Sequence, residues 1–403
     1  MRILLITDYL PYPAISGDTI RVYNLIKRIS RQHEIYLLVL FGAPESTDSI
    51  SHLLEFCRQI EVVNHEWPDP LACLPEMLVY YLKGWPLELR LLYSQKMADL
   101  VRRLTSDETF DIVQIEHSRL ALYRESIDSN SRCKSVLTFH NVAFDQSKRI
   151  SRIERNLVSS LRTWIFARQL FKWEPSYAEK FDRCFVVSEA ERRALLNRNS
   201  NLKVDVIPNG TDTQKYQRLD DSHGPPALLF IGSMSYAPCV DGAVYFCNQI
   251  LPSIQQAFQD IQVWIVGARP SHEVVQLAGK NIFVTGYVDN VLPYYQRSMV
   301  SIVPLRAGGG TRLKILEAMA LGRPIVSTTI GCEGLDIVDD RHLLIADEPE
   351  KFAKQTIRLL ADVALRERIV DQARRLVVEN YDWDVISKQS LDAYNDIVIN
   401  SLD

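Results

Sequence analysis

A run of three glycines opens the segment of the chain whose residue types most clearly suggest chemistry: Gly308, Gly309 and Gly310. Thr311 follows as the expected helix cap, and the cations Arg312 and Lys314 come directly after it. Glycines at this position expose backbone N–H groups at the positive end of a helix, which suits an anion. Cations at a helix start oppose the helix dipole unless such an anion is bound. The spacing therefore predicts a phosphate site built from this loop and the two cations.

The helix expected after the loop is apolar around most of its circumference but carries one carboxylate, Glu317. Such a helix is expected to be buried, and a buried carboxylate requires a partner. One candidate partner is Lys314, three residues earlier, in an ion pair. The other is the diol of a ribose, which an acidic side chain holds in other dinucleotide sites. A phosphate site beside a ribose-binding acid indicates a nucleoside diphosphate ligand.

Two further candidates follow apolar strand patterns in the first half of the chain. Gly17 precedes a helical pattern, and it is equally consistent with close approach of a ligand and with an ordinary turn. His140 lies at the carboxyl end of the strand pattern at 135–141, where a catalytic and a structural role are equally consistent with its position. The chain contains no G-x-G-x-x-G pattern, which argues against a nicotinamide-dependent dehydrogenase.

These residues must be positioned by elements that repeat along the chain. Short apolar runs alternate with helical patterns in two series, and such runs are typical of buried parallel strands. The expected strands are 2–7, 34–40, 60–64, 111–116, 135–141 and 183–188, then 227–233, 262–267, 282–286, 300–305, 324–328 and 342–347. The fold class is therefore α/β, with two doubly wound Rossmann-like domains facing across a cleft. We place the first at residues 1–207 and the second at 208–380, joined by a seam rich in Pro, Gly and Asp.

Composition limits the classes of function. The 403 residues carry a net charge of −4, which argues against a nucleic-acid binder that relies on overall positive charge. Seven dispersed cysteines without a C-x-x-C pair are typical of reduced thiols, and no apolar run reaches membrane-spanning length. We therefore expect a cytoplasmic protein. A basic amphipathic segment at 148–173 favours a helix packed on its own sheet, with peripheral contact to the inner face of a membrane as the alternative.

Four stretches together resemble the retaining glycosyltransferases of family 4, which have the GT-B fold. They are the Gly17 loop and the segments "VVSEAERRALLNRNSNLKVDVIPNGTD", "LEAMALGRPIVSTTIGCEGL" and "YDWDVISKQSLDAYNDI". In order and spacing the resemblance covers essentially the whole chain. It implies that a last helix, within 381–403, crosses back onto the first domain.

The resemblance also implies roles for single residues. Glu317 matches the family's ribose-binding Glu, His140 the histidine near the transferred sugar, and Gly17 the loop glycine beside the donor phosphates. The backbone of Tyr287 and Val288 matches the slot for the nucleobase.

Two departures from the family pattern affect the donor site. Gly309 stands where the family often has a Glu that contacts the sugar. After Gly232, at the end of the first strand of the second domain, Ser233 replaces the usual phosphate-binding Arg. We interpret Arg312 and Lys314 as the replacement for the missing phosphate cations.

The predicted activity is metal-independent transfer of a hexose from a nucleotide diphosphate sugar to an acceptor hydroxyl, with retention of configuration. The expected acceptor is a glycan or a lipid-linked glycan, in surface polysaccharide or glycolipid synthesis. No cofactor, metal or nucleic acid is expected. The alternatives are a nucleotide-sugar epimerase or a phosphorylase on the same fold, or a nucleotide-binding subunit without turnover, which Gly309 alone favours.

Overall fold

The computed structural model describes residues 1–403 except 41–46, 66–73, 84, 87, 154–156, 221–223 and 400–403. By internal contacts the chain divides into two compact units. Unit 1 comprises Met1–Lys148, Arg162–Asn209 and Trp383–Asp403. Unit 2 comprises Arg149–Leu161 and Gly210–Asp382.

Unit 1 is built on a seven-stranded sheet in the order β3-β2-β1-β4-β5-β6-β7, and every neighbouring pair is parallel. The strands are β1 (Arg2–Thr7), β2 (Glu34–Leu40), β3 (Gln59–Val63), β4 (Ile112–Glu116), β5 (Lys134–Phe139), β6 (Arg183–Val186) and β7 (Val204–Val206). Central strands such as β4 are buried along their whole length, as expected for a sheet covered on both faces. The edge strand β7 was not predicted, because its three residues adjoin the polar seam.

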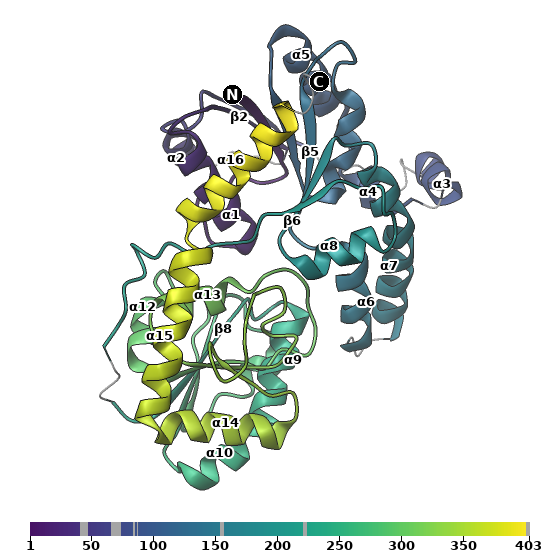
Figure 1. Ribbon diagram of the computed structural model, residues 1–403. Helices are drawn as coiled ribbons and strands as arrows, with labels where there is room; N and C mark the ends of the chain where they lie inside the picture. The colour runs from purple at the N-terminus through teal and green to yellow at the C-terminus, as the bar shows by residue number, and fades with distance from the viewer. Residues whose placement is uncertain are drawn as a thin grey trace. The chain divides into compact units, whose positions relative to one another are not determined.

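Helices cover both faces of this sheet, with α1 and α16 on one side and α7 and α8 on the other (Figure 1). The helices that belong wholly or partly to unit 1 are α1 (Gly17–Ile29), α2 (Thr47–Leu53), α3 (Leu74–Leu82), α4 (Glu88–Leu91), α5 (Gln95–Asp107), the 3-10 helix η1 (Ser118–Ser126), α6 (Ala143–Ile153), α7 (Leu157–Ala178), α8 (Glu189–Leu196) and α16 (Trp383–Ile399). The last helix, α16, packs against α1, so the end of the chain contributes to the interior of unit 1.

Unit 2 is built on a six-stranded sheet in the order β10-β9-β8-β11-β12-β13, again parallel throughout. Its strands are β8 (Ala227–Ile231), β9 (Gln262–Val266), β10 (Ile282–Val284), β11 (Val300–Val303), β12 (Ile325–Ser327) and β13 (Leu344–Ile345). Its helices are α9 (Ala237–Tyr245), the π-helix η2 (Phe246–Ile250), α10 (Leu251–Ala257), α11 (His272–Val275), α12 (Leu292–Arg297), α13 (Leu313–Ala320), α14 (Pro349–Ala361) and α15 (Val363–Asn380). The prediction of two Rossmann-like parallel sheets is confirmed.

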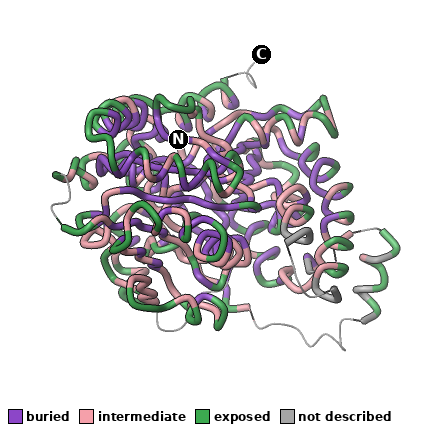
Figure 2. The backbone as a smooth tube through the Cα atoms, turned by 90° about the horizontal axis from the view of Figure 1, so that it is seen from below, coloured by how far each residue is buried: buried purple, intermediate pink, exposed green. Residues whose placement is uncertain are grey.

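Each unit has its own hydrophobic core, to which strands and helices both contribute, and the buried residues lie in the interior (Figure 2). The exposed residues lie mainly on the outer sides of the helices, as the amphipathic patterns predict. Within the described residues, no helix is both long enough and apolar enough to cross a bilayer.

The start of α13 differs from the prediction. The helix begins at Leu313, with Arg312 rather than Thr311 in the cap position. Arg312 has extended backbone angles, and its side chain makes no capping hydrogen bond. The reason is that the Arg312 guanidinium folds back onto the glycine loop instead. The predicted stop at Gly322 is confirmed, because this glycine has a φ of 70° directly after the helix.

Candidate functional site

The glycine loop of unit 2, residues 308–310, is bound by the buried side chain of Arg312. Its Nη1 atom donates to the carbonyl oxygens of Gly309 and Gly310, the latter at 3.1 Å. Gly308 has a φ of 127°, and a Cβ added there would lie 2.6 Å from Nη2 of Arg312. The position therefore requires glycine both for its backbone conformation and for the close approach of the guanidinium.

The same guanidinium keeps two unused donors. No acceptor among the described residues bonds to Nε or Nη2 of Arg312, although both atoms are buried. Burial lowers the pKa of Arg312, although nearby groups such as Tyr236 oppose this effect. Because a buried unpartnered donor costs about 1–3 kcal/mol, the arrangement favours an anionic ligand.

Lys314 brings a second cation to the end of β8. Its Nζ lies 3.9 Å from Sγ of Cys239, and a Cβ added at Gly232 would lie 2.9 Å from Nζ. Gly232 therefore leaves room for the ammonium beside the strand end, one residue before Ser233. Burial lowers the pKa of Lys314, and the charge of Arg312 lowers it further. Cys239 was not predicted, because nothing in its local sequence indicates that Lys314 lies beside it.

Glu317 has no ion pair within the described part of the chain, and in particular none with Lys314. Burial raises the pKa of its carboxyl to about 7, although the charges of Lys215 and Lys314 oppose the increase. Lys215, about a hundred residues earlier in the sequence, has the larger of these two effects and was not predicted. The geometry therefore does not favour the tight Lys314 ion pair that was the structural alternative for Glu317.

Glycines from three neighbouring strands meet at the carboxyl edge of this sheet. Gly232 N donates to Val266 O at 3.0 Å, and Gly267 N donates to Gly286 O at 3.2 Å. A Cβ at Gly267 would overlap the Gly232 carbonyl at 1.6 Å, so only glycine fits there. Packing therefore requires glycine at positions 232 and 267, whereas a Cβ added at Gly286 would meet no atom within 4 Å and leaves open space there.

Other predicted donor residues border this edge of the sheet. The Ser233 side chain is exposed, and its hydroxyl lies 3.3 Å from that of Ser235. Tyr287 follows β10 directly after Gly286 and is 63 % exposed, and Val288 is partly buried beside it. Unit 2 therefore gathers most of the predicted donor-binding positions at the carboxyl ends of its strands, where ligands of such sheets bind.

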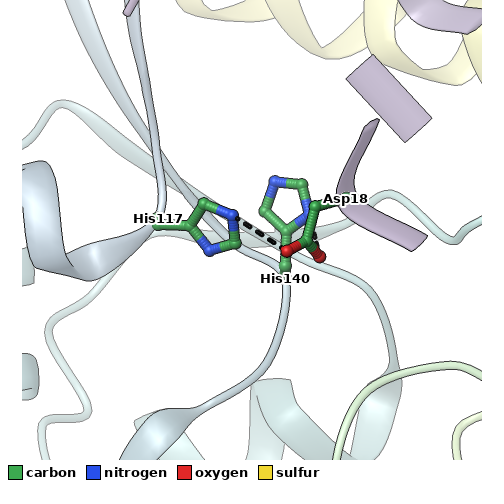
Figure 3. A group of neighbouring side chains, drawn as sticks. All are labelled: Asp18, His117 and His140. Atoms are coloured by element: carbon green, nitrogen blue, oxygen red, sulfur yellow. Dashed lines mark ion pairs between the residues drawn. The ribbon is translucent and has the colours of Figure 1, made fainter. Parts of the chain in front are cut away.

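Unit 1 brings His140 together with two residues that were not predicted as site residues, His117 and Asp18 (Figure 3). His140 follows β5, His117 follows β4, and Asp18 lies in the first turn of α1. Asp18 Oδ1 lies 3.4 Å from Nδ1 of His140, and Asp18 Oδ2 lies 3.5 Å from Nε2 of His117. The imidazole rings are stacked, with centroids 4.0 Å apart.

The start of α1 explains why Asp18 is available for this contact. Ser16 caps the helix and forms a capping box with Thr19, so the cap does not need the carboxylate of Asp18. The predicted Gly17 is the first residue of α1 and is exposed beside Asp18. Gly17 and His140 therefore belong to one neighbourhood, with Asp18 between them.

The cluster shifts the pKa values of its two histidines in opposite directions. Burial alone would lower the pKa of His140, but its hydrogen bonds to Asp18 and Glu116 raise it above the usual value. Burial and the neighbouring His140 charge hold the pKa of His117 well below the usual value. Burial alone would raise the pKa of Asp18, but the hydrogen bond from His140 and the histidine charges lower it.

Asp18, His117 and His140 are the three side chains of the described residues that could together hold a metal ion. The ring geometry does not fit one. A metal ligand lies close to the plane of the imidazole that binds it, at about 2 Å from the nitrogen. The two ring planes are only 21° apart and the rings are stacked, so the planes meet far from either nitrogen. The cluster therefore fits a charge pair that stabilises protonated His140.

Both glycosyltransferase domain models match this chain. "Glycosyltransferase Family 4" matches residues 15–215, and "Glycosyl transferases group 1" matches residues 225–362. The phosphatidyl-myo-inositol mannosyltransferase of Mycobacterium leprae is 25% identical over 370 residues, covering 86% of this chain and 92% of the relative.

Two further similarities span almost the whole chain. The lipopolysaccharide 1,2-N-acetylglucosaminetransferase of Salmonella typhimurium is 20% identical over 401 residues, covering 91% of this chain and 90% of the relative. The Anabaena protein Alr3699/HepE, solved in complex with UDP and glucose, superposes with a TM-score of 0.68 at 13% identity, covering 98% of this chain and 100% of that one. Because the two domain models together span most of the sequence, this chain belongs to the glycosyltransferases that join a family 4 domain to a group 1 domain on the GT-B fold.

Proposed function

We propose that this glycosyltransferase transfers a hexose from a nucleoside diphosphate sugar to an acceptor hydroxyl, with retention of configuration and without a metal ion. We place the reaction in the cytoplasm, in the assembly of a surface polysaccharide or a glycolipid. The observation that carries the proposal is the buried Arg312 guanidinium, whose Nε and Nη2 atoms have no acceptor among the described residues.

The donor would be held by unit 2. The free donors of Arg312, the ammonium of Lys314 and the glycine-loop backbone suit a diphosphate. The carboxylate of Glu317, without an ion pair in the described chain, suits the two ribose hydroxyls. The backbone at Tyr287 and Val288, which follows β10, would bind the nucleobase. The relative solved with UDP and glucose has the same fold, which supports a uridine nucleotide as the first donor to test.

The chemical step would break the bond between the anomeric carbon and the diphosphate oxygen. The acceptor oxygen would bond to that carbon on the same face, and its proton would pass to the departing diphosphate. Because negative charge grows on the diphosphate, Arg312 and Lys314 would stabilise the transition state more than the bound donor. His140 would act on the transferred sugar through its positive charge, because Glu116 and Asp18 already take its two ring N–H groups.

The acceptor would be a glycan or a lipid-linked glycan, because the relatives include a phosphatidyl-myo-inositol mannosyltransferase and a lipopolysaccharide 1,2-N-acetylglucosaminetransferase. One surface of α7 supports contact with a membrane. Leu161, Trp164 and Ile165 are exposed, and the guanidinium of Arg168 lies 5.5 Å from the centroid of the Trp164 ring. Exposed apolar and basic side chains on one helix are typical of contact with anionic lipid.

Part of the basic segment 148–173 does not contribute to this surface. Arg149 forms an ion pair with Glu333 within unit 2. The side chains of residues 150–159 lie outside the described part of the chain. We therefore assign the proposed membrane contact to α7 beyond residue 160.

The test of the function measures release of nucleoside diphosphate by protein that has been dialysed against EDTA. UDP-, GDP- and ADP-hexoses are offered with and without lipid-linked glycan acceptors. We expect release that depends on the acceptor and does not need added metal. An epimerised sugar without acceptor would establish the epimerase alternative. Binding without release for every donor and acceptor would establish a nucleotide-binding subunit.

A further inference from the structure

A chain of polar side chains runs through the interior of unit 1 from α16 to His140. The hydroxyl of Tyr394 in α16 donates to Oε1 of Gln114 in β4. Nε2 of Gln114 donates to Oε1 of Glu116, two residues further along the same strand. Oε2 of Glu116 lies 2.5 Å from Nε2 of His140. Three successive hydrogen bonds therefore join the last helix of the chain to the histidine.

Stability alone does not explain why these hydrogen-bonded side chains lie in the interior of unit 1. Gln114 and Glu116 point to the same face of β4, because side chains two residues apart in a strand share a face. Together with Tyr394 they line a small cavity of about 10 Å³ whose other walls are apolar. Its apolar lining is Ile3, Leu5, Val22, Leu25, Ile26, Ile29 and Ile35. Apolar side chains at both positions would complete this core without the cost of burying an acid.

Each bond of the chain has a defined direction. A tyrosine hydroxyl carries one hydrogen, and its bond to Oε1 of Gln114 turns the amide so that its N–H group faces Glu116. Glu116 is 1 % exposed, and both of its oxygens accept a hydrogen bond, one from Gln114 and one from His140. Nε2 of His140 is thereby fixed as a donor, and Nδ1 is directed toward Asp18.

We propose that Tyr394 is a positioning residue for His140: acting through Gln114 and Glu116, it holds the imidazole protonated and oriented toward Asp18. A helix at the far end of the sequence would in this way set the state of a histidine at the strand ends of unit 1. The part of the proposal that concerns transfer rests on the proposed function, whereas the state of His140 is measurable in the empty protein.

Other titratable and charged groups near His140 also affect how this site responds to pH. Burial alone would raise the pKa of Glu116, but the hydrogen bond and the charge of His140 lower it. The charge of Arg21, a buried residue of α1, lowers the pKa of Glu116 further. Arg119 in η1 acts on both His117 and Asp18. Burial raises the pKa of Glu191 in α8 to about 7, although His140 opposes this effect. Tyr9, after β1, faces Glu116 and Asp18.

The test is a titration of His140 by NMR in protein without substrate, comparing wild type with Tyr394→Phe and Glu116→Gln. The pKa of His140 is expected to fall by about 1–3 units in Glu116→Gln, because an opposite charge in contact is removed. In Tyr394→Phe it is expected to fall by about half a unit, since only the support of that charge is lost. The alkaline limb of the pH dependence of kcat/KM, which reports the pKa values of the free enzyme, should move down by the same amounts.

Tyr123→Phe is the matched control, because this buried tyrosine of unit 1 donates its hydroxyl to Leu92 O, outside the polar chain. It should leave the titration of His140 unchanged. If Tyr394→Phe is poorly folded, Gln114→Leu interrupts the chain at the next link and should shift the His140 pKa in the same direction.

The two failures can be told apart. A His140 pKa that stays within 0.1 unit of wild type in both Tyr394→Phe and Gln114→Leu would overturn the positioning role, whatever the activity. An unchanged pH–rate profile combined with a shifted His140 pKa would overturn the part that concerns transfer. Absence of transfer in the wild type would instead overturn the proposed function and leave the titration result standing.

Discussion

The substitution Arg312→Ala tests the proposed phosphate site most selectively. In the empty protein, Arg312 donates to Gly309 O and Gly310 O but buries two unpartnered N–H groups. Hydrogen bonds from a charged donor contribute about 1.5–3 kcal/mol each, and each buried unpartnered group costs about 1–3 kcal/mol. The two effects oppose one another, so the free energy of unfolding of the empty protein should change by no more than about 1–2 kcal/mol.

Binding of a nucleoside diphosphate should change far more. If the diphosphate accepts from Nε and Nη2, removal of the guanidinium loses two bonds of about 1.5–3 kcal/mol each, which corresponds to about a 150-fold or larger increase in Kd. The bare nucleoside, which has no phosphate, should bind the variant and the wild type equally well. Isothermal titration calorimetry with UDP and uridine, repeated with the GDP and ADP pairs, measures both quantities.

Two further variants make the result specific. Arg306→Ala is the matched control, because Arg306 lies in the same loop but its charge is already paired with Asp241. It should leave the affinity for the diphosphate within about twofold of wild type. Gly308→Ala should reproduce Arg312→Ala, because the added Cβ would lie 2.6 Å from Nη2 and the φ of 127° disfavours alanine.

The reasoning would be refuted if Arg312→Ala weakened nucleoside and nucleoside diphosphate equally, or weakened neither. Either result would mean that the glycine loop and Arg312 have only a structural role. The phosphates would then bind elsewhere.

The remaining predictions concern Glu317 and α7. Glu317→Gln should weaken donor binding about ten- to a hundredfold, because a hydrogen bond to a charged group is worth about 1.5–3 kcal/mol. The same change should stabilise the empty protein at pH 8 but hardly at pH 5. The pKa of Glu317 in the folded protein is about 7, so its carboxyl is charged, and costly to bury, only above that pH. Equal melting temperatures of variant and wild type across that pH range would contradict the burial of the charge. Trp164→Ser should reduce co-sedimentation with phosphatidylglycerol vesicles at low salt, whereas wild type that binds no anionic vesicle at any salt concentration would exclude the membrane contact.

Local patterns were sufficient to predict both sheets except for the edge strand β7. Their strands are continuous apolar runs, and each run carries its signal within a few residues. The glycine run was also visible locally, and its neighbours Arg312 and Lys314 were predicted as cations of the site. Its cap was predicted wrongly at Thr311, because the pattern could not show that the Arg312 guanidinium would bond to the loop carbonyls.

The unpredicted contacts join residues that are far apart in sequence. Lys215 and Cys239 come close to α13 only through packing across unit 2. His117 and Glu116 were detectable in principle, because charged and polar residues at the end of a buried strand have to be compensated. No local pattern could show that a tyrosine of the last helix would bond to Gln114.

The most direct measurement of the central claim is the anomeric configuration of the product. An α-linked nucleoside diphosphate hexose is supplied with a lipid-linked glycan acceptor after EDTA treatment, and proton NMR records the coupling constant of the new anomeric proton. The account predicts an α-linked product together with one nucleoside diphosphate released per bond formed. A β-linked product would contradict retention, and a requirement for added divalent metal would contradict the role given to Arg312 and Lys314 as the charges that stabilise the leaving diphosphate.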